Sequence, residues 1–156
     1  MGGTLTSAED PKAAPVFVVS ALQDAGTATT PGNALQRIQI IKGWVDEKGV
    51  THEKVIDVAW SGGRHIDPAT GRLDPVGSTV NTAASTYENT IGAPSLAAWW
   101  QDDDFNPDRP AFYYPRVLEI PTPRWSTYDA RDLGIEPMAP VAIQERAIGS
   151  AIWFEP

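Results

Sequence analysis

The chain has no cysteine, only two histidines and no long hydrophobic run. Without cysteine it can form no disulfide and offers no thiolate nucleophile. His52 and His65 form no His-x-His or His-Glu-x-x-His pair, so the sequence predicts no imidazole-rich metal site, no catalytic residue and no cofactor. No segment reaches the roughly 18–20 apolar residues of a membrane span, so we expect no membrane insertion. The N-terminal residues also lack the pattern of a signal peptide.

Basic residues are scarce as well, with 12 Lys and Arg against 20 Asp and Glu and a formal net charge of −8. This balance argues against nucleic acid or an anionic membrane as a partner, because both attract basic surfaces. Hydrophobic content of 42% and charged content of 21% are ordinary for one globular domain. The 13 glycines and 14 prolines favour short strands and turns over a helical bundle.

The hydrophobic pattern predicts a mainly β protein, an antiparallel β-sandwich of immunoglobulin-like or similar type with one short helix. Residues 1–14 are expected to be a flexible lead-in, and 15–156 a single domain. A hairpin turning at Asp46–Gly49 is the clearest local feature. Ser126 is predicted to cap a helix over 127–133 that ends at Gly134. Strands are expected over 15–22, 35–45, 50–60, 82–91, 112–120 and 141–154. Gly149 is a point where the last of these could break, and 95–100 fits either a strand or a helical turn.

An acidic loop has the most suggestive spacing, with oxygen ligands alternating at Asp102, Asp104, Asn106 and Asp108. The first half of a calcium loop has this pattern, because Ca²⁺ binds several carboxylate or amide oxygens. Pro107 then stands where the turn requires glycine, and Tyr113 stands where a bidentate glutamate should close the site. Two interpretations therefore stay open, a solvated turn whose aspartates bind backbone amides and a calcium site.

Six tryptophans are many for this length, and two of them, Trp99 and Trp100, are adjacent. On a strand they cannot both face inward, so one must reach solvent, a loop or another domain. Most tryptophans of a sandwich fill its core, but exposed ones can stack on sugar rings. The loop 61–79 and the segment 121–128 are expected to approach a domain junction. The candidates for a ligand or domain interface are His65, Trp99, Trp100, Arg124 and Trp125.

Several strings resemble the C-terminal region of the domain-of-unknown-function 3604 family of bacterial proteins. They cover residues 35–46, 52–55, 111–114, 116–130 and 143–147, and Pro115 and Ile148 depart from the pattern. The resemblance implies a longer protein whose upstream part is similar to metal-dependent hydrolases of the polymerase-and-histidinol-phosphatase type.

On that basis this chain would be a noncatalytic accessory domain, and its partner would be the missing upstream catalytic domain. The resemblance slightly favours a periplasmic or extracellular location. The alternative is a binding module that holds a carbohydrate or another small ligand on exposed tryptophans.

Overall fold

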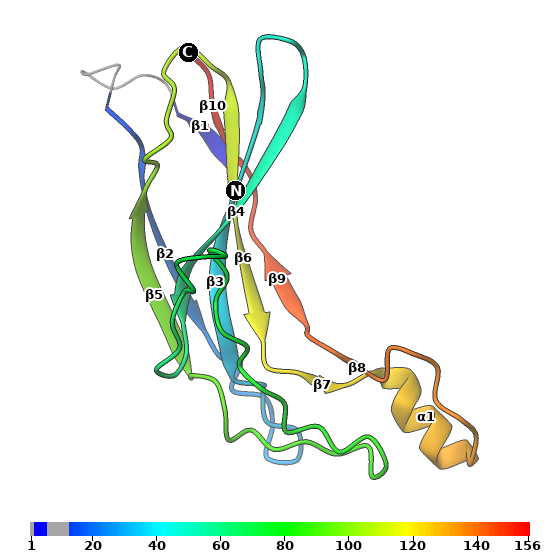
Figure 1. Cartoon of the computed structure of the whole chain (residues 1–156). Helices are drawn as coiled ribbons and strands as arrows, with labels where there is room; N and C mark the ends of the chain where they lie inside the picture. Colours follow the sequence, from blue (N-terminus) through cyan, green and yellow to red (C-terminus); the bar gives the residue numbers. More distant parts are fainter. Residues whose placement is uncertain (1, 6–12) are drawn as a thin grey trace.

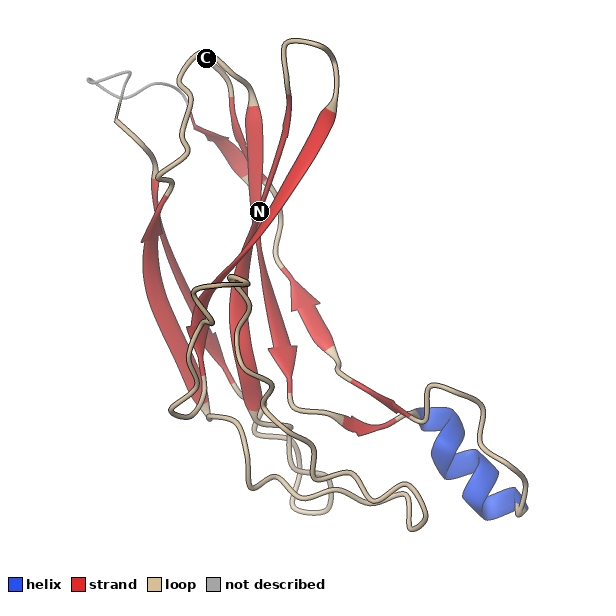
Figure 2. Ribbon diagram, viewed as in Figure 1, coloured by secondary structure: helices blue, strands red, loops and turns tan. Residues whose placement is uncertain are grey.

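The structure is a computed structural model that describes residues 2–5 and 13–156, and strands dominate it (Figures 1 and 2). The large sheet has the strand order β1-β10-β6-β3-β4, with β9 pairing to β6 beyond this path. Its strands are β1 (Gly3–Leu5), β3 (Leu35–Val45), β4 (Thr51–Trp60), β6 (Ala111–Glu119), β9 (Arg146–Ile148) and β10 (Ile152–Phe154). The mainly β, sandwich-like class predicted from the sequence is confirmed.

The β3–β4 hairpin forms where its sequence predicts it. Gly49 takes the positive φ of 79° that closes the turn, and Asp46 accepts backbone hydrogen bonds from Lys48 and Val50. Asp46 also bonds to His52, and this bond is the main reason that the pKa of the Asp46 carboxyl lies below its usual value. The half of β4 nearest the turn is exposed, as its polar residues predict.

A second layer consists of β2 (Val16–Leu22) and β5 (Ser95–Gln101), which pair antiparallel and lie against the large sheet (Figure 1). The segment 95–100, which was open between a strand and a helical turn, is therefore a strand. Residues alternate along both strands, so one face of this ribbon is half-buried and the other is exposed. The core between the layers contains Ile40, Ala111, Tyr113 and Phe154, with Phe17 and Trp100 packed against it.

Proline at position 115 lies in a gap between two partners of β6. On that edge β10 pairs with β6 as far as Tyr113, and β9 pairs with it from Arg116 onward. Pro115 has no N–H to donate, so this gap suits it, where its carbonyl still accepts a hydrogen bond from the N–H of Gly149. The segment predicted as a final strand over 141–154 is divided into β8 (Ala142–Ile143), β9 and β10. The interruption between β9 and β10 falls at Gly149, where a break was expected, and Gly149 packs against Pro115 at the gap.

The chain leaves the large sheet after β6 and forms a small outlying unit. Here β7 (Thr122–Pro123) pairs with β8, and α1 (Trp125–Leu133) follows (Figure 2). Gly134 ends the helix in the left-handed conformation, as predicted, but the predicted cap at Ser126 is wrong. Arg124 is the N-cap, without a side-chain cap bond, and Ser126 Oγ is buried without a partner among the described residues. No helix in the described residues has the length and apolarity to cross a membrane.

Two further expectations differ from the structure. The strand predicted over 82–91 is wrong, because this segment makes turns and only a single isolated bridge between Asn81 and Thr86. Within the lead-in predicted over 1–14, Gly3–Leu5 form β1, which runs parallel to β10. The rest of that lead-in prediction falls partly on residues 1 and 6–12, which lie outside the described residues. Small polar residues therefore did not prevent strand pairing at the sheet edge.

Candidate functional site

The acidic loop begins with a buried carboxylate. Asp102 is 1% exposed, and its Oδ2 lies 2.5 Å from the Nζ of Lys42 and accepts a hydrogen bond of 2.7 Å from the Tyr113 hydroxyl. Lys42 is itself 2% exposed, since it shares the core-facing side of β3 with Ile40 and Trp44. Burial, followed by the bond to Asp102, raises the pKa of the Tyr113 phenol, so this group stays a donor at neutral pH.

The loop is anchored at a second point by Asp104. Its backbone carbonyl accepts a bond of 2.9 Å from Lys42, and its carboxylate contacts the ammonium of Lys54 on β4. The hydrogen bond and charge of Lys54 lower the pKa of the Asp104 carboxyl. Asn106 accepts a bond from the backbone N–H of Asp108, which is turn formation. The loop is thus tied to the sandwich by two lysines.

These contacts bear on the calcium interpretation. The described part of the chain holds no group of three or more His, Cys, Asp or Glu side chains placed to bind a metal ion. Asp102 and Asp104 each have an ammonium as their counter-charge, which Ca²⁺ would have to displace.

We therefore expect calcium to leave the stability of the protein unchanged. The melting temperature should be the same in millimolar calcium and in excess chelator, because the lysines already neutralise the two carboxylates. Differential scanning calorimetry in the two buffers measures this, with magnesium as a control for ionic strength. A melting temperature that rises with calcium but not with magnesium would restore the calcium interpretation.

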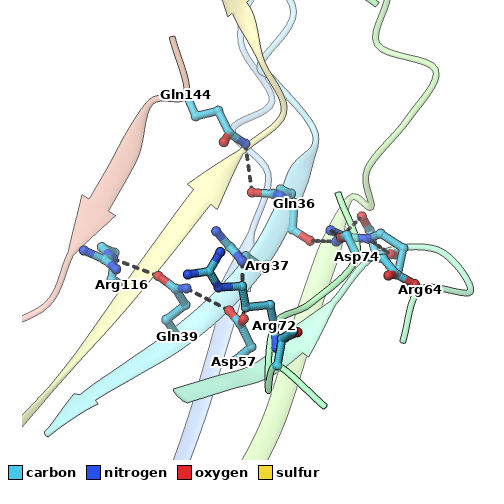
Figure 3. Close-up of polar contacts among 11 residues, drawn as sticks. Gln36, Arg37, Gln39, Asp57, Arg64, Arg72, Asp74, Arg116 and Gln144 are labelled. Carbon is cyan, nitrogen blue, oxygen red and sulfur yellow. Dashed lines mark hydrogen bonds and ion pairs between the residues drawn. The ribbon is translucent and has the colours of Figure 1, made fainter. Parts of the chain in front are cut away.

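A polar network crosses three strands on the face of the large sheet that points away from β2 and β5 (Figure 3). Arg116 donates to Gln39, which donates to Asp57, and the oxygen atoms of Asp57 also accept a bond of 3.3 Å from Arg37. Gln39 is only 4% exposed, so the network satisfies polar groups that burial would otherwise penalise. Apart from Arg37 Nε, which is buried without a hydrogen-bond partner among the described residues, these side chains bond to one another, which indicates a structural role that fixes β6, β3 and β4 together.

Arg64 holds the long loop 61–79 against the sheet. Its guanidinium donates to the backbone carbonyls of Ser61, Gln36 and Asp74 (Figure 3). A hollow of about 490 Å³ lies beside this clamp, between residues 73–78 of the loop and Pro121. The structure thus brings together parts of the two segments that were expected to approach a domain junction. His65 is exposed, and its backbone pairs with Asp74 without its ring lining this hollow.

The tryptophan candidates do not form one site. Trp100 faces the core beside Phe17, whereas Trp99 is 71% exposed on the outer face of β5. Trp125 is 67% exposed at the start of α1, with the Arg124 guanidinium 5.8 Å from its ring centroid. Figure 1 shows β5 and α1 at opposite sides of the molecule, so Trp99 and Trp125 cannot act together on one ligand.

Reasoning from the sequence missed Lys42 and Tyr113, the two partners of Asp102. A signal for Lys42 is present in the alternation of β3, since position 42 has the parity of Ile40 and Trp44. Nothing local marks Asp102 as its partner, because 60 positions of sequence separate Lys42 from Asp102 and only the packing of the two sheets joins them.

Two layers of mainly antiparallel strands with one short helix define a sandwich-like β module. The chain belongs to the family described as "Protein of unknown function (DUF3604)", which it matches over residues 1–156. The family resemblance of its sequence is thereby confirmed. No curated protein and no solved structure matches the chain.

Proposed function

We propose that this chain is a noncatalytic accessory β-sandwich that packs against another domain of a longer DUF3604 protein. The observation that carries the proposal is the outer face of the β2–β5 ribbon. Val18 is 84% exposed, Leu22 is 81% exposed, and Trp99, which lies opposite Val18 in the register, is 71% exposed. A contiguous apolar face of this kind on a soluble domain marks an interaction surface.

The composition of this face supports a protein partner. Its eight outward positions, four on each strand, contain no charged residue. They are Val16, Val18, Ser20, Leu22, Ser95, Ala97, Trp99 and Gln101. The core of a domain interface is likewise depleted in charge and enriched in aromatic residues. Within the described residues β2 hydrogen-bonds only with β5. The second edge of β2 therefore has no strand partner there, and the partner domain would also cover this edge.

The partner that fits is the upstream domain implied by the family resemblance, a metal-dependent hydrolase of the polymerase-and-histidinol-phosphatase type. In this arrangement the metal and the catalysis belong to the partner, and the sandwich supplies apolar packing and loops around the cleft. Domain junctions are common ligand sites. No residue of β2 or β5 lines the hollow beside the 61–79 loop, so the hollow would join this junction only where the partner extends beyond the ribbon.

Hydrogen–deuterium exchange on this chain and on the longer protein tests the proposal. We expect the amides of β2 and β5 to exchange more slowly in the longer protein, because the partner covers the ribbon. Val18→Asp should leave the melting temperature of this chain nearly unchanged, since the side chain is 84% exposed, but should remove the added protection in the longer protein. Leu133→Asp on α1, 70% exposed, is the matched control and should not affect this protection. Equal exchange of the ribbon in both proteins would contradict the proposal.

A further inference from the structure

A row of four residues crosses the large sheet on the face opposite to β2 and β5. Glu53 on β4, Gly43 on β3, Phe112 on β6 and Trp153 on β10 are consecutive partners in the strand register. Side chains alternate between faces along a strand. Because Ala111 points into the core, its neighbour Phe112 and the rest of this row point away from the core.

Aromatic rings form the floor of this surface. The tip of the Phe112 ring lies over Gly43, where a Cβ would come within 2.2 Å of Phe112 Cζ. Trp153 lies beside Phe112, with ring centroids 5.3 Å apart, and Tyr114 follows at 6.3 Å with its ring inclined by only 12°. Glycine usually weakens the interior of a strand. At position 43 packing explains it, because a glycine leaves room for the Phe112 ring to lie across the strand.

Gly43, Phe112 and Trp153 line a pocket of about 570 Å³ at the hairpin end of the sheet, whereas Tyr114 lies outside it. This volume falls in the range of roughly 300–1,000 Å³ that small-molecule sites occupy. Thr51 and Glu53 line the pocket, and their side-chain oxygens have no hydrogen-bond partner among residues 2–5 and 13–156. Trp153, one of the two tryptophans that line the pocket, is 52% exposed. Apolar rings and a few unpaired polar groups therefore converge in one place.

We propose that this pocket binds a neutral saccharide. The C–H face of a sugar ring is weakly positive and packs on the negative face of an aromatic ring. Trp153 and Phe112 supply such faces, and the carboxylate of Glu53 accepts hydrogen bonds from sugar hydroxyls at the rim. The site is separate from the β2–β5 ribbon, so the inference stands apart from the proposed docking function.

The charges around the pocket distinguish between acidic, neutral and cationic ligands. Glu53 lies in the pocket, and the adjoining hollow is lined by three carboxylates (Asp46, Glu47 and Asp108) and by two cations (Lys48 and Arg109), so the acidic groups outnumber the basic ones on a chain of net charge −8. Acidic sugars are therefore repelled and neutral sugars are not. A small organic cation would be attracted, but cation sites enclose their ligand with ring faces. Phe112 and Trp153, which line the pocket, are register partners on one face of the sheet and do not surround a ligand, which suits a sugar ring packed on the exposed Trp153 better.

Isothermal titration calorimetry tests the proposal with neutral hexasaccharides of β-linked glucose, mannose and xylose. Oligogalacturonate serves as the acidic probe and tetramethylammonium chloride as the cationic probe. We expect saturable binding of at least one neutral probe and at least tenfold weaker binding of the acidic one. Trp153→Ala should abolish the signal, Trp153→Phe should restore part of it, and Glu53→Gln should weaken it several-fold.

Trp99→Ala is the matched control, because Trp99 is also an exposed tryptophan, 71% against 52% for Trp153, and lies on the other layer. It should leave saccharide binding unchanged, and circular dichroism should show that every variant keeps the strand content of the parent. Flat titrations with all neutral probes overturn the proposal. Binding that Trp99→Ala removes while Trp153→Ala preserves it, or binding of tetramethylammonium alone, overturns it as well.

Discussion

Asp102→Asn is expected to lower the free energy of unfolding by about 3–5 kcal/mol, the cost of removing one partner from a buried ion pair. The amide occupies the same space but carries no charge, so the Lys42 ammonium would remain in the core without a counter-ion. The Tyr113 hydroxyl would also lose its anionic acceptor. Since domains of this kind have a total stability of roughly 5–15 kcal/mol, the variant should lose a large part of it. Urea unfolding followed by tryptophan fluorescence measures the change.

Asp103→Asn provides the control for this experiment. Asp103 is the exposed neighbour in the same loop, and its replacement should change stability by no more than about 0.5 kcal/mol. The double variant Lys42→Met with Asp102→Leu should lose less free energy of unfolding than the sum of the losses of the two single variants, because neither charge is then left buried alone. A stability of Asp102→Asn within experimental error of Asp103→Asn would show that the ion pair does not hold the loop.

Ile41→Ala is expected to cost about 2–5 kcal/mol, as truncations of fully buried aliphatic side chains do. Ile41 is 1% exposed although it points away from the sandwich core, on the same face as its register partners Tyr114 and Val55. The cost arises because the methyl groups lose their packing and leave a cavity under the aromatic floor. Chemical denaturation is the measurement, with circular dichroism to confirm that the fold is retained.

Two further variants, Ile41→Val and Val45→Ala, show whether the stability lost in Ile41→Ala comes from the burial of the side chain. Ile41→Val should cost only about 0.5–1.5 kcal/mol, because one methylene is removed. Val45→Ala, on the same face of β3 but 48% exposed, should cost well below the Ile41→Ala value. Equal losses for Ile41→Ala and Val45→Ala would mean that the outer face has no packed layer of its own.

The hairpin, the sandwich class and the strand after the acidic loop could be predicted because their signals are local, whereas the segment 95–100 before the loop stayed open between a strand and a helical turn. Alternating apolar residues, a glycine with positive φ and prolines at strand ends act through neighbours in the chain. The same local reasoning failed at Ser126 and over 82–91. A serine near a helix start allows a capping hydrogen bond, and β-branched residues allow a strand, but tertiary contacts decide whether the capping bond or the strand forms. Thr127, for example, donates to the carbonyl of Val141 on the segment that covers the helix start.

By itself the sequence determined the class of fold, the family, the lack of thiol chemistry and the acidic character of the surface. Only the tertiary structure decided that Lys42 and Asp102 are buried together and that Phe112 and Trp153 meet across two strands. It also decided that Trp99 faces outward and Trp100 inward. The physical reason is that composition and periodicity act over a few residues. Burial of a charge or assembly of a pocket instead depends on strands that are distant in the chain and adjacent in the sheet.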